Sequence, residues 1–210
     1  MITSKLDVVL NMNHQKKNII LFVFLFLLSI KSFSQINEKH NNKCLVIIGV
    51  EHRYTQVTNT KSSTQVVIDN INSVIEKINP DNIVYVYSVH KALYLTKKGS
   101  KTGLDSIGMI RDERLHRVNS NIILKKEVNA FADKEFIKFL QKNKSKEIII
   151  VGLSAEYYIK EALLSGKELG YNMYFIPEAI MGKSVKKKEI ILNKLKKNGI
   201  KELPINQLIN

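Results

Sequence analysis

The sequence predicts an α/β fold: a single doubly wound domain in which a mostly parallel sheet is flanked by helices. Nearly unbroken apolar runs, such as CLVIIGV (44–50) and EIIIVGL (147–153), are typical of strands buried on both faces of a parallel sheet. Segments with an apolar stripe at helical spacing separate these runs. Because strands that alternate with helices pair in parallel, helices are expected on both faces of the sheet.

Each expected element has its own signal in the sequence. Five strands are expected, at 44–50, 82–89, 121–125, 147–153 and 171–176. Four helices are expected between and after them: one within 64–80 that ends at Pro80, one capped by Asp133, one capped by Ser154 that ends at Gly170, and one from Ser184 to Asn198 closed by Gly199. The long polar stretch from His90 to Asn119 is expected to shape access to a site.

The N-terminus has the layout of a secretory signal peptide. Lys16 and Lys17 precede an apolar run at 19–30, and the small-x-small triplet 32–34 follows it. The run is shorter than the roughly 20 residues that span a bilayer, although an uncleaved anchor is the alternative. We therefore predict a signal peptide at 1–34, with Met12 as an alternative start, and a secreted or periplasmic domain at 35–210 without stable membrane insertion after cleavage.

Composition narrows the functional classes. Apolar residues make up 44% and charged residues 25% of the chain, as in soluble globular proteins. The formal net charge of +14 raises the alternative of a polyanion partner, but the densest basic run, 186–197, has no interleaved aromatic residues and is better explained as a solvated helix face. Cys44 is the only cysteine, so no internal disulfide forms, and we expect this thiol to be structural.

Ligands of open parallel sheets bind beyond the carboxyl ends of the strands. The residues that follow the expected strands therefore define the candidate site. They fall in four segments: 49–54, 88–90, 125–131 and 153–158.

These segments resemble those of a known family. LVIIGVEHRY, ERLHRVNSNIILKKEVNAF, IIIVGLSAEYYIKEALLSGKELGYNMYFIPEAI and GIKELPINQLI are similar, in order and spacing, to segments of the isochorismatase-like cysteine hydrolases, which include nicotinamidases and N-carbamoylsarcosine amidohydrolases. The similarity extends over about 43–209. The resemblance implies a Rossmann-like three-layer domain, hydrolase chemistry and association into dimers or tetramers.

The family's catalytic triad is matched only in part. The resemblance places the catalytic Asp at Gly49, the Lys at Lys125 and the nucleophilic Cys at Tyr158. Gly49 offers no base, and a phenol with an ordinary pKa near 10 is a poor nucleophile at neutral pH. Tyr158 is therefore interpreted as a plug or wall of the pocket. The remaining expected pocket residues are Tyr54, His90, Phe131, Leu153, Ser154 and Tyr157.

Other residues at the same strand ends could supply an acid or metal ligands. Glu51 stands two positions after Gly49 and has a side chain long enough to approach Lys125. His52 and His90 suggest a metal site, because some nicotinamidases bind a metal, but Ser88 stands where that family's metal set has an Asp. Two histidines without a carboxylate are a thin set of ligands, so neither a metal nor a cofactor is expected.

Two functions of different classes follow from these residues. The first is an exported, catalytically inactive pseudoenzyme that acts in binding or structure, with a small-molecule ligand and a homo-oligomeric state implied by the resemblance. The second is a hydrolase of a small amide or vinyl ether with rewired chemistry, in which Lys125 acts with Glu51 or Tyr158.

Overall fold

A computed structural model gives the fold of this chain. It describes residues 43–56, 61–89, 91–96, 99–104 and 110–209. The predicted signal peptide and His90 lie outside the described residues.

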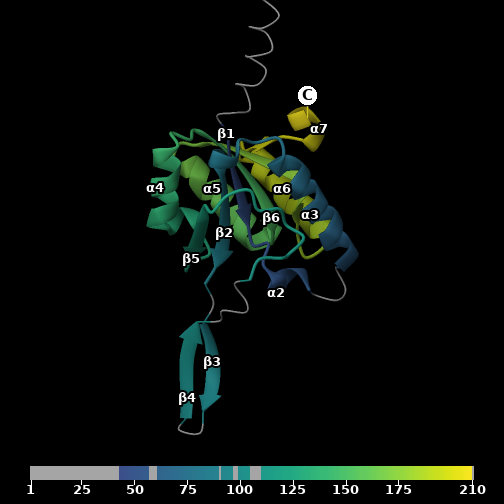
Figure 1. The fold of residues 1–210 in the computed structure, drawn as a ribbon. Helices are drawn as coiled ribbons and strands as arrows, with labels where there is room; N and C mark the ends of the chain where they lie inside the picture. Colours follow the sequence, from purple (N-terminus) through teal and green to yellow (C-terminus); the bar gives the residue numbers. More distant parts are fainter. Residues whose placement is uncertain (1–42, 57–60, 90, 97–98, 105–109, 210) are drawn as a thin grey trace, which may run out of the picture. The chain divides into compact units, whose positions relative to one another are not determined.

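The centre of the domain is a six-stranded sheet in the order β5-β2-β1-β6-β7-β8 (Figure 1), and every strand pair in it is parallel. Its strands are β1 (Lys43–Ile48), β2 (Ile83–Ser88), β5 (Ile122–Lys125), β6 (Glu147–Leu153), β7 (Asn172–Met181) and β8 (Lys201–Glu202). Every residue of β1 and β2 is buried. The predicted α/β class with a parallel sheet is confirmed, and the five expected strands all form.

Helices cover both faces of the sheet. The apolar side chains of α3 (Lys61–Ile75) and Leu208 of α7 (Ile205–Ile209) pack on one face. On the other face pack α4 (Lys134–Lys142), α5 (Lys160–Glu168) and α6 (Val185–Lys197). Figure 1 shows α3 and α4 on opposite sides of the sheet. The core is thus two apolar layers, one on each face of the central strands.

Two of the expected helix caps form and one does not. The side chain of Asp133 accepts hydrogen bonds from the backbone N–H groups of Glu135 and Phe136, and Ser184 caps α6 in the same way. The prediction that Ser154 caps a helix is wrong, because its side chain makes no capping bond and its backbone is left-handed, with φ 68° and ψ 62°. The chain continues from it as a π-helical turn, η4 (Ala155–Ile159), before α5 begins.

Several short elements connect the main ones. Within the long polar stretch, β3 (Lys91–Thr96) and β4 (Gly99–Leu104) form a separate antiparallel hairpin. The other short elements are α2 (His52–Thr55), η2 (Pro80–Asn82) and η3 (Ala130–Ala132). Strand β7 extends beyond the expected 171–176, and β8 forms in the tail, where no strand was expected. No helix within the described part of the chain is long and apolar enough to span a bilayer.

Gly152 sets the geometry of the chain as it enters the candidate site. Its φ is +127°, and a Cβ atom added there would lie 2.0 Å from the carbonyl oxygen of Ile48. Only glycine allows β6 to approach the end of β1 so closely. The β6–β7 register shifts at the same place, between Ile150 and Gly152. The strand therefore leaves the sheet at a defined point, just before Ser154 and η4.

Candidate functional site

The carboxyl ends of three neighbouring strands bring the candidate site together. Ser88 ends β2 and pairs in register with Lys125 at the end of β5, while Glu51 follows β1. Tyr158 reaches the same place from η4, which follows β6. Side chains from four separate segments therefore meet at the edge where parallel sheets bind ligands.

The ring of Tyr158 fills the space between β1 and Lys125. A Cβ atom added to Gly49 would lie 3.6 Å from Cδ2 of Tyr158, so the ring packs against the place where any other residue would have a side chain. The same ring also contacts Lys125, whose Nζ atom lies 3.9 Å from the ring centroid. This is a close cation–π contact at a buried site, where such contacts are strongest. Glycine at 49 and tyrosine at 158 are sterically matched to each other.

Lys125 carries a buried ammonium group whose loss of hydration is only partly offset by contacts within the protein. It is 1% exposed, and its Nζ donates a hydrogen bond of 3.0 Å to the carbonyl oxygen of Glu127. Burial lowers its pKa from 10.5 to about 8, against the opposing influence of the Glu51 and Glu127 carboxylates. A neutral amine is therefore accessible at mildly alkaline pH, which gives Lys125 the capacity to exchange a proton.

Glu51 is the matching buried acid. Its side chain is fully buried, and its Oε1 atom accepts a hydrogen bond from the backbone N–H of Ser88. Within the described part of the chain, its Oε2 atom has no hydrogen-bond partner, and neither does the buried hydroxyl of Ser88. Burial raises the pKa of the Glu51 carboxyl from 4.5 to about 7, although the Ser88 N–H and Lys125 act in the opposite direction. Buried polar atoms without partners are uncommon and mark a site that a ligand or water completes.

The turn after β6 holds Tyr158 in place through an unusual backbone. Ser154 has a left-handed conformation, which is uncommon for residues other than glycine. The backbone N–H of Ile159 then donates to the carbonyl of Ser154, five residues back, as in a π-helix. Left-handed residues and π-turns are frequent at functional sites, because they position a side chain that a regular helix would direct elsewhere.

The other expected pocket residues take different positions. The hydroxyls of Tyr54 and Tyr158 lie 3.2 Å apart and share a hydrogen bond. Leu153 is buried in the core at the end of β6. Tyr157 is 51% exposed, and its hydroxyl lies 3.2 Å from the Nζ atom of Lys183. Phe131 packs in the core, where its ring contacts Phe136 and Tyr171. His90 is outside the described residues.

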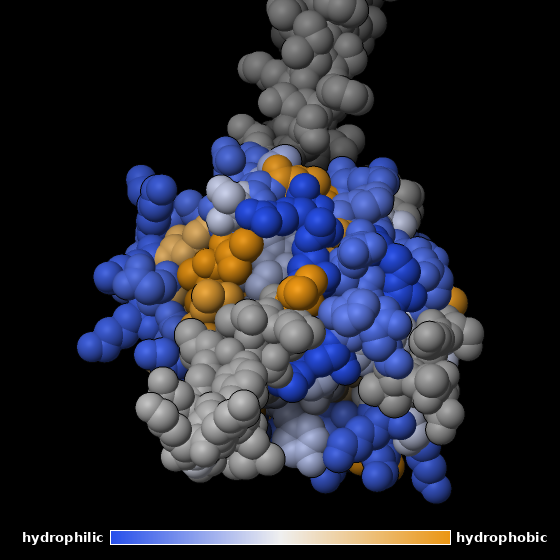
Figure 2. Space-filling model, turned by 60° about the horizontal axis from the view of Figure 1, so that its bottom comes forward, coloured by the Kyte–Doolittle hydropathy of each residue, from blue (hydrophilic) through white to orange (hydrophobic). Residues whose placement is uncertain are grey.

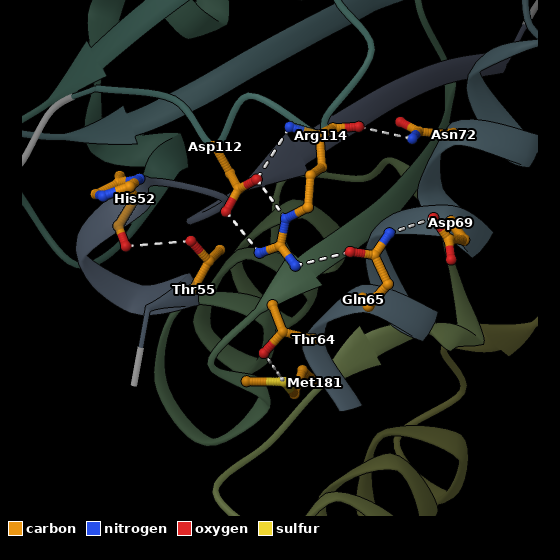
Figure 3. Close-up of polar contacts among 9 residues, drawn as sticks. All are labelled: His52, Thr55, Thr64, Gln65, Asp69, Asn72, Asp112, Arg114 and Met181. Atoms are coloured by element: carbon orange, nitrogen blue, oxygen red, sulfur yellow. Dashed lines mark hydrogen bonds and ion pairs between the residues drawn. The ribbon is translucent and has the colours of Figure 1, made fainter. Parts of the chain in front are cut away.

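Asp112 is a second buried acid near the site, and the sequence analysis did not select it as a candidate residue. Its carboxylate accepts hydrogen bonds from the backbone N–H, Nε and Nη2 of Arg114, the last at 2.7 Å (Figure 3). Arg114 also donates to Gln65, and its carbonyl accepts from Asn72 of α3. The Arg114 guanidinium holds the pKa of Asp112 well below its usual range. This network fastens the 110–118 segment to α3.

The donor set does not fit a metal ion. Among the residues that the structure describes, no group of three His, Cys, Asp or Glu side chains gathers closely enough to hold one. Glu51 faces an ammonium, and Ser88 offers a hydroxyl. His52 is exposed on α2.

Comparison with protein families identifies the fold's relatives. The model of the isochorismatase domain matches residues 43–203, which include all six strands of the sheet. The chain belongs to the isochorismatase family. It is 25% identical over 139 residues to the secreted isochorismatase effector Isc1 of Verticillium dahliae, a match that covers 65% of this chain and 70% of the relative. The resemblance of the sequence to this family is thus confirmed.

Solved structures support the same fold. An isochorismatase family protein from Desulfovibrio vulgaris superimposes with a TM-score of 0.65 at 14% identity, over 80% of this chain and 96% of that one. The pyrazinamidase of Pyrococcus horikoshii, solved in complex with zinc, gives a TM-score of 0.61 at 18% identity, over 78% and 99%. An octameric hydrolase of unknown specificity from Escherichia coli gives 0.55 at 11% identity, over 80% and 78%. At these identities the likeness shows the fold alone.

Proposed function

We propose that this protein is an exported isochorismatase-family domain whose site is closed to the family's hydrolysis and which acts in binding or structure. The observation that carries the proposal is the position of the Tyr158 ring, between Gly49 and the ammonium of Lys125. A substrate carbonyl would have to occupy this space to meet a nucleophile at position 158. The ring excludes it.

The chemistry of the remaining groups supports inactivity. Thiolate catalysis requires a sulfur atom beside a base or cation, and Cys44 is buried in β1 with a burial-raised pKa of about 12. Gly49 has no group that could accept a proton. The hydroxyl of Tyr158 is already engaged with that of Tyr54. Of the triad implied by the family resemblance, Lys125 alone keeps its side-chain chemistry.

Export and assembly are parts of the same proposal. The predicted signal peptide at 1–34 and the likeness to a secreted effector of Verticillium dahliae both support secretion. The octameric relative from Escherichia coli supports a homo-oligomer. A polyanion partner has the net charge of +14 in its favour and is tested by the salt dependence of binding.

Hydrolysis by the mature protein, residues 35–210, tests the proposal. The panel contains nicotinamide, a carbamoyl amino acid and isochorismate, each incubated with the wild type and with Lys125→Ala. A matched variant, Lys138→Ala, removes an exposed lysine of α4 instead. We expect no turnover above background from any of the three proteins. Turnover by the wild type and Lys138→Ala that is abolished in a folded Lys125→Ala would contradict inactivity.

A rewired hydrolase is the second candidate, because one observation favours it. Glu51 and Lys125 are a buried acid and a buried base whose pKa values move toward neutrality, to about 7 and about 8. Such pairs are frequent at catalytic sites. If the panel shows turnover, Glu51→Gln separates the two roles: loss of activity assigns proton transfer to Glu51, and retained activity directs attention to Tyr158.

A further inference from the structure

A groove of about 560 Å³ lies beside β5, on the sheet face opposite Lys125. Leu124 and Ile122 of β5 line it, and strand alternation directs them away from the face that carries Lys125. Ile110 also lines it. Ile110 and Leu124 are 53% and 49% exposed, so the groove brings two exposed apolar side chains together. Figure 2 shows several such apolar patches between strongly polar side chains on the face that it presents.

Tyr87 of β2 gives the groove a polar group without a partner. Tyr87 lines the groove, is only 4% exposed, and its buried hydroxyl makes no hydrogen bond to any residue that the structure describes. Burial raises the pKa of this phenol, so it keeps its proton and remains a hydrogen-bond donor at neutral pH. Leaving such a donor unsatisfied destabilises the folded protein. An acceptor supplied by a ligand would remove that cost.

The charged residues around the groove indicate the sign of the charge that a ligand would carry. Arg111 and Arg117 line it, and both act electrostatically on the Tyr87 phenol. Glu113 is the one acid in the lining. Two guanidinium groups and one carboxylate leave a single positive charge in excess. The groove therefore suits one negative charge.

The wall that carries these arginines is held firmly. The Tyr85 hydroxyl donates to the carbonyl of His116 and accepts from the backbone N–H of Val118. The Asp112–Arg114 network ties the same segment to α3 (Figure 3). Arg111 itself donates to the carbonyl of Leu115. A pre-organised wall loses little entropy when a ligand binds.

We propose that this groove binds a small monocarboxylate with an apolar body, whose carboxylate meets Arg111, Arg117 and the Tyr87 hydroxyl while its body covers Ile110 and Leu124. The groove adjoins Glu51, which pairs with Arg111 through an isolated β-bridge and whose charge acts on the Tyr87 phenol. Lys125 faces the other side of the sheet, because adjacent residues of β5 point in opposite directions. The proposed binding stands whether or not the protein hydrolyses any substrate. Charge complementarity and the unpartnered phenol favour it over a purely apolar occupant.

Titration of the full chain with 4-phenylbutyrate and with its neutral amide, 4-phenylbutyramide, tests the proposal by calorimetry. We expect the acid to bind and the amide to bind on the order of tenfold more weakly, since a charge-assisted contact is lost. Equal affinities for the two compounds, or no binding of the acid at millimolar concentration, would overturn the proposal.

Three variants locate the binding. Arg117→Gln is expected to weaken binding of the acid on the order of tenfold, and Tyr87→Phe about fivefold. Lys138→Gln removes the same positive charge from α4 and is expected to leave the affinity unchanged. Tyr87→Phe also distinguishes binding from folding, because removing an unsatisfied hydroxyl should raise the unfolding midpoint of the free protein while it weakens the complex. Wild-type affinity in both Arg117→Gln and Tyr87→Phe would overturn the assignment.

Discussion

Asp112 and Glu51 are both buried acids, yet the protein treats them in opposite ways. Asp112 is 2% exposed and receives three hydrogen bonds from Arg114, which hold its pKa well below the usual range. Glu51 is 0% exposed, receives a hydrogen bond from the Ser88 N–H at one oxygen and none at the other, and has a pKa of about 7. The first acid is paired within the protein, and the second is left partly unsatisfied.

The difference separates a structural role from a functional one. The Asp112 carboxylate is paired with Arg114, and Arg114 in turn donates to Gln65 of α3, so the acid helps to hold the 110–118 segment against that helix. A buried carboxylate that lacks partners destabilises the fold, and proteins retain such groups mainly at sites that bind or react. We therefore propose a structural role for Asp112 and a role in the site for Glu51, and each proposal predicts a different response to mutation.

The largest effect is expected at Asp112. Asp112→Ala should lower the free energy of unfolding by about 3 kcal/mol, because it removes the carboxylate that pairs with Arg114 and so loosens the contact of Arg114 with Gln65 of α3. Denaturation by urea measures this loss. Glu113→Ala, at the neighbouring exposed position, is the matched control and should change little. If Asp112→Ala lost no more stability than Glu113→Ala, Asp112 would have no structural role of this kind.

A smaller effect with the opposite sign is expected at Glu51. Because its pKa is about 7 in the folded protein and ordinarily 4.5, the unfolded chain releases the proton first as pH rises. Stability is thus lost between about pH 4.5 and pH 7, and the loss is complete above pH 7. Glu51→Gln removes this penalty while its amide oxygen still accepts from Ser88. The full shift corresponds to roughly 3 kcal/mol. Because the substitution also removes the carboxylate that favours the Lys125 ammonium, we expect the free energy of unfolding to rise by about 2 kcal/mol at pH 8.

The pH profile provides the control for that prediction. At pH 4 the wild type and Glu51→Gln should unfold with nearly equal free energies, because Glu51 is then protonated in both states. Asp112 behaves in the reverse manner: its stabilising contribution is present above its ordinary pKa of 3.8 and declines as pH falls below it. A stability gain in Glu51→Gln that is the same at pH 4 and pH 8 would show that the pKa of Glu51 is not raised in the folded protein.

The sequence was sufficient for most of the fold. Apolar runs such as 44–50 and 147–153 were long and unbroken enough to be read as buried parallel strands, and Asp133 and Ser184 stood directly before amphipathic stretches. The rule that ligands bind at strand ends also selected Glu51 and Lys125 as neighbours, and the electrostatic influence of each on the other's pKa agrees with their proximity. The periodicity of apolar residues predicts the strands and helices, and the topology of a parallel sheet predicts which strand ends meet.

Local backbone geometry was the part that could not be predicted. Ser154 is a good N-cap residue by type, but the close approach of Gly152 to Ile48 turns the chain so that Ser154 becomes left-handed. Asp112 and Arg114 lie two residues apart in a polar segment with no periodic pattern, so nothing in the sequence indicated that Asp112 would be buried or that Arg114 would bond to α3. In both cases a tertiary contact, rather than a local preference, decides the conformation.

The smallest effect tests what fixes Tyr158 over Gly49. The ring has two kinds of contact: its face meets the Lys125 ammonium at 3.9 Å, and its hydroxyl bonds to Tyr54 at 3.2 Å. Tyr158→Phe keeps the first and removes the second, so it should cost about 1 kcal/mol, the usual worth of one hydrogen bond. A double-mutant cycle with Tyr54→Phe, followed by urea denaturation, isolates the coupling of the two hydroxyls from their other contacts. A coupling near zero would mean that steric fit to Gly49 and the cation–π contact hold the plug, and that the hydroxyls only occupy the space left between the rings.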